Sequence, residues 1–89
     1  MLSPELETLD QLLGGALAIH AVASLFNDPS HCAQALEAML NAGELRLTDS
    51  MGKAVPVSLF LRLRSDPSFW GQDSSYRVEI SDLGANRIA

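Results

Sequence analysis

Three side chains of this sequence could act as a nucleophile or a base: His20, His31 and Cys32. A nucleophile and its base must lie within hydrogen-bond reach of one another. His31 and Cys32 are consecutive, and on a helix consecutive side chains point about 100° apart, so they cannot form such a pair. Cys32 falls on an apolar stripe, which favours a small core residue, and His20 lies in an apolar stretch. We therefore predict no catalytic residue and a protein that is not an enzyme.

The sequence also gives no indication of a metal site or a cofactor site. Two histidines and one cysteine fall short of the ligand set that a catalytic zinc ion needs. The sequence has no phosphate loop, dinucleotide fingerprint or nucleophile elbow. A single cysteine cannot form an internal disulfide. We predict no metal, no cofactor, no evident small-molecule substrate, and a cytoplasmic location.

Charge is distributed unevenly along the 89 residues, which we expect to form one domain, residues 1–89. The net charge is −5. Residues 1–45 carry six acids and no base, whereas residues 46–89 carry six bases and five acids. Any cationic surface must therefore come from the second half. A chain this short buries only about 60 to 65% of its unfolded surface, so a homodimer is expected.

The apolar run at residues 11–26 is predicted to be a buried helix. Glu5, Glu7 and Asp10 precede it where a signal peptide would carry bases. The run is also shorter than the roughly 18 to 20 apolar residues that span a bilayer. We expect no membrane association.

Three helices are predicted in the first half. Ser3 and Pro4 have the residue types of a helix start, and Gly14-Gly15 ends that helix. A second helix is expected at about residues 16–26. Asp28 is expected to cap a third helix that begins at Pro29, and Gly43 stands where a left-handed C-terminal cap is wanted.

The second half changes to an alternating pattern, which predicts strands. Apolar residues alternate with polar ones at about residues 44–48, 57–64 and 76–81. These segments predict three antiparallel strands, followed by a short helix that begins near Ser81-Asp82. The fold class is therefore α+β, with three N-terminal helices, a three-stranded antiparallel sheet and a short C-terminal helix.

The stretches NDPSHCAQALEAMLNAGELRL and YRVEISDLGANRIA resemble the turn, recognition helix, first wing strand and last strand of winged helix-turn-helix regulators of the MarR and PadR types. The resemblance implies a winged-helix-like fold and a transcription regulator that binds DNA. It also implies that the third helix reads the major groove.

The third helix has few side chains that suit DNA binding. Gln34 and Asn41 can pair with adenine edges, but phosphate neutralisation requires lysine or arginine, and this helix has neither. Glu37 would repel the backbone. We therefore keep DNA binding as the alternative, with Lys53, Arg62 and Arg64 as the phosphate contacts.

Four arginines are predicted on the outward face of the sheet, with one aromatic residue among them. They are Arg46, Arg62, Arg64 and Arg77, with Phe60. Such a patch suits an anionic partner. The competing interpretation is that these arginines pair across strands with Glu44 and Glu79 and only solubilise the face.

Phe69 and Trp70 lie in a polar segment, residues 65–75. They predict either an anchor for a partner or a plug that packs on the domain's own core, and the small size of the domain favours the plug. We expect a small interaction module that binds a protein partner, or a second copy of itself, through the sheet face or the aromatic segment.

Overall fold

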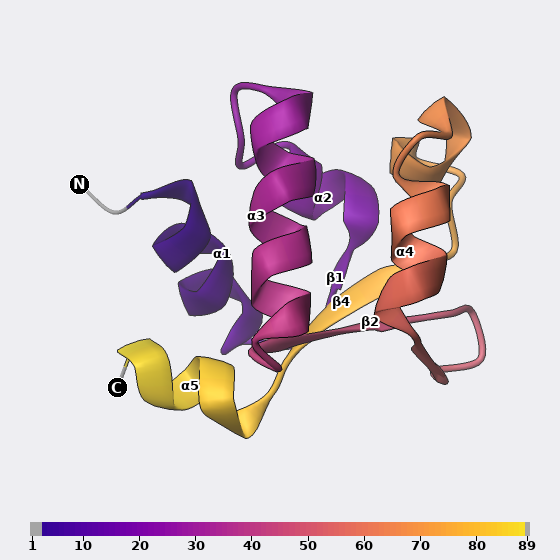
Figure 1. Cartoon of the computed structure of the whole chain (residues 1–89). Coiled ribbons are helices and arrows are strands. Elements are labelled where there is room, and N and C mark those ends of the chain that lie inside the picture. Colours follow the sequence, from indigo (N-terminus) through magenta and orange to yellow (C-terminus); the bar gives the residue numbers. More distant parts are fainter. Residues whose placement is uncertain (1–2, 89) are drawn as a thin grey trace.

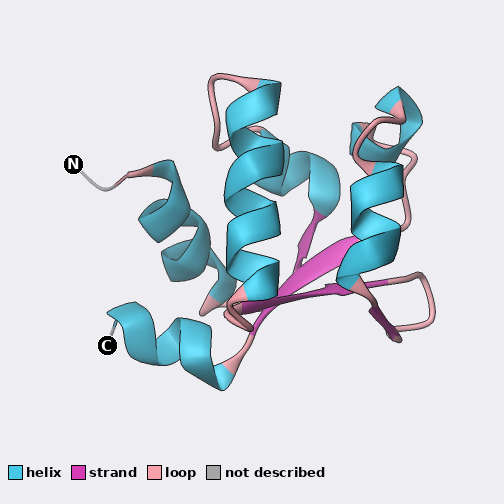
Figure 2. Cartoon of the chain, in the orientation of Figure 1, coloured by secondary structure: helices cyan, strands magenta, loops and turns pink. Residues whose placement is uncertain are grey.

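The computed structural model describes residues 3–88 and has an α+β fold. Helices and strands are interspersed along the chain, as Figures 1 and 2 show. The first part contains α1 (Pro4–Leu12), β1 (Leu17–Ala18), α2 (Ile19–Ala23), α3 (Pro29–Asn41) and β2 (Leu45–Thr48). The second part contains β3 (Ala54–Val55), α4 (Val57–Leu63), the 3-10 helix η1 (Pro67–Trp70), β4 (Arg77–Ile80) and α5 (Asp82–Ile88). The α+β class is confirmed, but the predicted order of helices before strands is not matched.

The four strands form one antiparallel sheet in the order β1-β4-β2-β3. The central pair, β2 and β4, places Leu45 opposite Ile80 and Leu47 opposite Val78. Leu45, Leu47 and Val78 are buried, because they point towards the helices. Helices α3 and α4 stand side by side over the strands (Figure 1). The molecule is therefore two layers, with its core between helices and sheet.

The predicted caps of α1 and α3 are confirmed. Ser3 Oγ accepts the backbone N–H of Leu6 at 3.3 Å, and Asp28 Oδ1 accepts the N–H of Ser30 at 3.0 Å. Each cap satisfies a donor that the first turn of a helix leaves unpaired. Gly43 adopts φ 76° after α3, a conformation that favours glycine, and the chain turns there into β2.

Helix α5 is fastened to this turn. The N–H of Ser81 donates to Glu44 O at 2.9 Å, and the Ser81 hydroxyl donates to the carbonyl of Gly43. Ser81 Oγ also accepts the N–H of Gly84 at 3.2 Å, which caps α5. The α3–β2 turn and the start of α5 are thus one hydrogen-bonded junction.

The second predicted helix, at residues 16–26, is shorter than expected. Helix α2 spans only Ile19–Ala23, and Leu17–Ala18 form the edge strand β1. Leu17 pairs with Val78, and Ala18 pairs with Arg77. These residues form backbone pairs with the edge of β4. They are therefore a strand, although their apolar spacing predicted a helix.

The predicted strand at residues 57–64 is wrong, because this segment is helix α4. Four of its residues are leucine or arginine, which are good helix formers, and Pro56 occupies the N-cap position. Both edges of β4 are already paired, with β1 and β2, so no place beside β4 remains for it. A segment of only seven residues that is mostly apolar fits a strand or a helix by its pattern.

An aromatic cluster holds η1 on the core. Phe60 and Phe69 are buried, and their ring centroids lie 5.9 Å apart in an edge-on arrangement. Trp70 packs on both, at 6.2 Å from Phe60 and 4.9 Å from Phe69. Phe69 is therefore the plug that the sequence predicted, and Trp70 packs partly against the same core.

Candidate functional site

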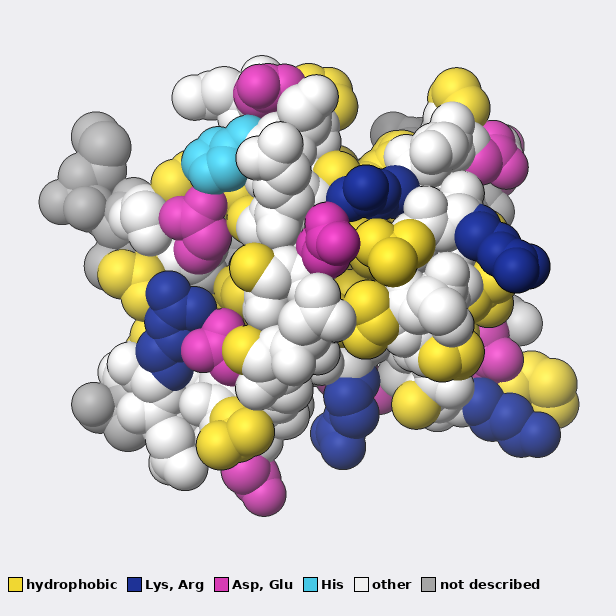
Figure 3. Space-filling view, viewed as in Figure 1, with side chains coloured by type: hydrophobic (Ala, Val, Ile, Leu, Met, Phe, Trp, Pro, Cys, Tyr) yellow, Lys and Arg dark blue, Asp and Glu magenta, His cyan; other side chains and the backbone are white. Residues whose placement is uncertain are grey.

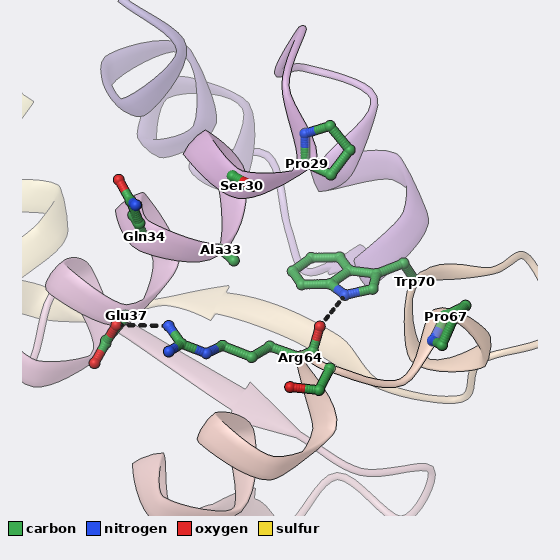
Figure 4. Close-up of a pocket in the computed structure, with 9 residues that line it drawn as sticks. Pro29, Ser30, Ala33, Gln34, Glu37, Arg64, Pro67 and Trp70 are labelled. Carbon is green, nitrogen blue, oxygen red and sulfur yellow. Dashed lines mark hydrogen bonds and ion pairs between the residues drawn. The ribbon is translucent and has the colours of Figure 1, made fainter.

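A groove of about 550 Å³ runs between α3 and the segment formed by α4 and η1, residues 57–70. Figure 4 shows its walls. One wall is a single face of α3, with residues spaced three and four apart: Ser30, Ala33, Gln34 and Glu37. The opposite wall includes Arg64, Pro67 and Trp70. We call this the α3/α4 groove.

The Trp70 side of the groove is held by several local contacts. Asp66 Oδ1 accepts the N–H of Ser68 at 3.0 Å and so caps η1, which begins at Pro67. The indole Nε1 of Trp70 donates to the carbonyl of Arg64 at 3.0 Å. The polar tip of Trp70 is therefore satisfied inside the chain, and the indole ring forms a rigid apolar wall.

An ion pair connects the two walls. Arg64 Nη1 lies 2.7 Å from Glu37 Oε2, with about one third of each side chain exposed (35% and 33%). An ion pair this exposed contributes only about 0.2 to 1 kcal/mol. Its main effect is electrostatic, because Glu37 neutralises the arginine predicted to contact a partner or a phosphate.

Two further ion pairs involve His31 of α3 and Glu44, which follows α3. His31 Nε2 lies 2.6 Å from Glu5 Oε1 of α1, and Arg87 Nη1 lies 2.8 Å from Glu44 Oε1. Burial raises the pKa of Glu5, but its own backbone N–H and the hydrogen bond and charge of His31 outweigh burial, so the net pKa is lowered. Basic groups thus pair with the acids that flank α3.

The predicted arginine patch on the sheet is not formed. Arg46 on β2 and Arg77 on β4 do lie exposed on the outer face. Arg62 and Arg64 lie on α4 instead, since that segment is not a strand. Phe60, expected among the arginines, is fully buried, because a helix turns it towards the core.

The predicted pairing of sheet arginines with Glu44 and Glu79 forms no ion pair within residues 3–88. The register places Arg46 opposite Glu79, as the solubilising interpretation expects. Glu44 pairs with Arg87 of α5 and not with a sheet arginine. Figure 3 shows Lys and Arg side chains spread over the visible face, several of them beside acids.

Of the residues proposed for DNA contact, only Gln34 and Arg64 are brought together, in the α3/α4 groove. Gln34 and Asn41 are exposed on α3, and Lys53 is exposed in the turn before β3. Gln34 borders the α3/α4 groove. Lys53 and Arg62 form no ion pair within residues 3–88. These two cations therefore lie in the β2–β3 turn and on α4, and neither is on the helix expected to read bases.

The candidate catalytic residues do not come together. Cys32 is fully buried, and burial raises the pKa of its thiol to about 12, which leaves it protonated and unreactive. His31 faces Glu5, while Nδ1 of His20 is buried without a hydrogen-bond partner in the part of the chain described. Residues 3–88 hold no group of three His, Cys, Asp or Glu side chains placed to bind a metal.

Sequence reasoning missed the α3 wall of the groove. Glu37 and Arg64 are 27 positions apart, and no local pattern connects them. Because residues 57–64 were predicted to be a strand, nothing in the sequence placed this segment beside Ala33 and Glu37. Recognition of α4 as a helix was the missing signal.

Comparison with known proteins adds no neighbour: no family model, no curated protein and no solved structure matches this chain. Within residues 3–88, every helix is too short or too polar to cross a membrane.

Proposed function

We propose that this chain is a non-enzymatic interaction module that binds a segment of a protein partner in the α3/α4 groove. The observation that carries the proposal is the groove itself, walled by the only tryptophan of the chain. Two residues predicted to bind a partner, Arg64 and Trp70, lie together in it. The proposal moves the partner site from the sheet face to the helical face.

The chemistry of the groove supports a peptide. Trp70, Pro67 and Ala33 offer apolar surface, while Gln34 and the Glu37–Arg64 pair offer donors and acceptors. Tryptophan and arginine are the residues most enriched where binding energy concentrates. The groove is open along one side of α3 (Figure 4), so an extended or helical segment can lie along it.

The test is a selection of random peptides against the folded chain, followed by calorimetry. The variant Ala33→Arg places a long side chain inside the groove, and arginine is a good helix former. The matched control is Ala38→Arg, the same change on the exposed side of α3. We expect peptides that bind the wild-type chain and Ala38→Arg, and that lose at least tenfold in affinity on Ala33→Arg.

Trp70 supplies an independent readout, since a ligand in the groove contacts the indole and shifts its emission. Far-ultraviolet circular dichroism establishes that both variants are folded. The proposal is abandoned if selection enriches no peptide, or if the enriched peptides bind Ala33→Arg as tightly as the wild-type chain.

A second candidate is the DNA-binding regulator implied by the winged-helix resemblance. It is supported by the succession of α2, a short turn, α3 and a glycine turn into β2, which is the order of a helix-turn-helix followed by a wing. It also has Gln34 and Asn41 exposed on α3. Against it stand the pairing of Arg64 with Glu37 and the absence of lysine and arginine from α3. A duplex affinity that falls steeply with salt, with a flatter slope for Arg62→Ala, would favour this candidate.

We also propose that the module is cytoplasmic and forms a homodimer. The small core of an 89-residue chain supports association, because a domain of this size is marginal alone. Sedimentation velocity over a range of concentrations measures the mass in solution. A mass of about 9.6 kDa at every concentration would remove the dimer and leave the peptide site untouched.

A further inference from the structure

A second hollow, of about 590 Å³, lies on the outer face of the sheet. Its floor follows from the strand register, which places Ala18 and Thr48 on either side of Arg77. These three residues alternate with the inward-facing Leu17, Leu47 and Val78, so their side chains leave the opposite face of the sheet. Both neighbours of Arg77 are small, and the sheet is therefore hollowed around the arginine. We call this site the sheet hollow.

Two loops form the walls of the sheet hollow. One is the β2–β3 turn, in which Asp49 Oδ1 accepts two backbone N–H groups of the turn at 2.9 and 3.0 Å. The other is the segment before β4, residues 72–76. Its last residue, Tyr76, packs on the core with its ring centroid 5.2 Å from that of Phe69. Both walls are thus held by contacts of the chain itself, which lowers the cost of ordering them around a ligand.

Charges of both signs line the sheet hollow. Arg77 and Glu79 both line it, and neither forms an ion pair within residues 3–88. They are two positions apart on β4, so their side chains share one face and their Cα atoms are about 7 Å apart. Asp49 also lines the hollow, and it follows Thr48, on the side of Arg77 away from Glu79. One cation therefore lies between two acids.

This order of charges fits a ligand that carries both signs. A simple anion such as phosphate would meet Arg77 but would also face the carboxylates of Glu79 and Asp49, and a simple cation would face the arginine. A free α-amino acid carries a carboxylate and an ammonium group on the same carbon atom. An arginine can bind such a carboxylate through two parallel hydrogen bonds.

From this arrangement we infer that the sheet hollow binds a free α-amino acid, with a basic side chain preferred. The α-carboxylate pairs with Arg77, the α-ammonium group pairs with Glu79, and the side-chain cation lies towards Asp49. The ligand is bound and not converted. This site is separate from the α3/α4 groove, because among residues 3–88 none lines both.

The experiment is a titration of the full chain with free lysine, followed through the amide resonances by NMR. We expect shifts at residues 49–52 and 72–79, which surround the sheet hollow, and none along the α3/α4 groove. Nα-acetyl-lysine lacks the α-ammonium charge and lysinamide lacks the carboxylate, so each should bind on the order of tenfold more weakly. Free glutamate should also bind more weakly than lysine, because its side chain has the same charge as Asp49.

Two variants test the assigned partners, Arg77→Gln and Glu79→Gln. Each removes one charge and keeps a polar side chain. The matched controls are Arg62→Gln and Glu7→Gln, the same changes at residues that do not line the hollow. Lysine should bind both hollow variants on the order of tenfold more weakly and the controls as it binds the wild-type chain. Circular dichroism establishes that each variant is folded, and the ligand series on the wild-type chain decides if one is not.

Three results would overturn the inference. The first is an absence of shifts around the sheet hollow at lysine concentrations up to about 10 mM. The second is lysinamide or inorganic phosphate binding as tightly as lysine, because the hollow would then recognise a single charge. The third is unchanged lysine binding to Arg77→Gln, which would place the ligand elsewhere on the chain.

Discussion

The sharpest structural test is Gly84→Ala in α5. A methyl group at this position would lie 2.3 Å from the carbonyl oxygen of Glu44 and 2.9 Å from Cγ1 of Ile80. The Glu44 carbonyl cannot retreat easily, since it already accepts the N–H of Ser81 at 2.9 Å. Arg87 of α5 also forms an ion pair with the Glu44 carboxylate, which is a second contact between α5 and this turn. Alanine therefore forces α5 away from the α3–β2 turn.

Two effects of opposite sign contribute to the stability of this variant. Alanine is preferred over glycine inside a helix by about 1 kcal/mol. Overpacking costs about 1 to 3 kcal/mol, and a contact with backbone at 2.3 Å belongs at the upper end. The net destabilisation is about 2 kcal/mol, which lowers the Tm by roughly 8 to 16 °C for a domain of this size.

Thermal and urea unfolding followed by circular dichroism measure this effect. The control is Gly14→Ala, where the nearest atom to the added methyl is Gln11 O at an ordinary 3.5 Å. We expect the control to change stability by less than about 0.5 kcal/mol. A Gly84→Ala variant as stable as the wild-type chain would mean that α5 does not pack on Glu44 as described.

Three further predictions concern the core and α1. Because Cys32 is buried and its pKa is about 12, Ellman's reagent at pH 8 should label it only in urea; rapid labelling of the native chain would place it at the surface. The lowered pKa of Glu5 means that its contribution to stability is full above its ordinary value of 4.5 and is lost as the pH falls through the folded value. Urea midpoints of wild type and Glu5→Gln should therefore differ at pH 7 and converge in acid, and a difference that grows in acid would contradict the His31 contact. Phe60→Ala should cost about 3 to 5 kcal/mol, against under about 1 kcal/mol for Leu61→Ala at the surface; equal losses in urea unfolding would argue that α4 is turned differently.

The local signals of the sequence located several elements correctly. Ser3 and Asp28 cap α1 and α3 as predicted, because a cap is a contact between residues two or three positions apart. Gly43 adopts the expected positive φ. The strands at Leu45–Thr48 and Arg77–Ile80 were found from their alternation, since each has one face on the core.

The candidate site was not predictable in the same way. The sequence put Arg64 and Trp70 in a partner surface, but it assigned Arg64 to a sheet and left Ala33 and Glu37 out. The wrong assignment of α4 caused both errors. One wrong element therefore displaced half of the candidate site.

The sequence by itself determined the helix starts, the glycine turn, the two central strands and the division of charge between the halves of the chain. Each depends on residues close together in the chain, so its physics is local. The tertiary structure alone decided whether residues 57–63 are helix or strand, because β1 and β2 occupy both edges of β4. It also decided that Arg64 meets Glu37 across 27 positions, since α4 packs directly against α3.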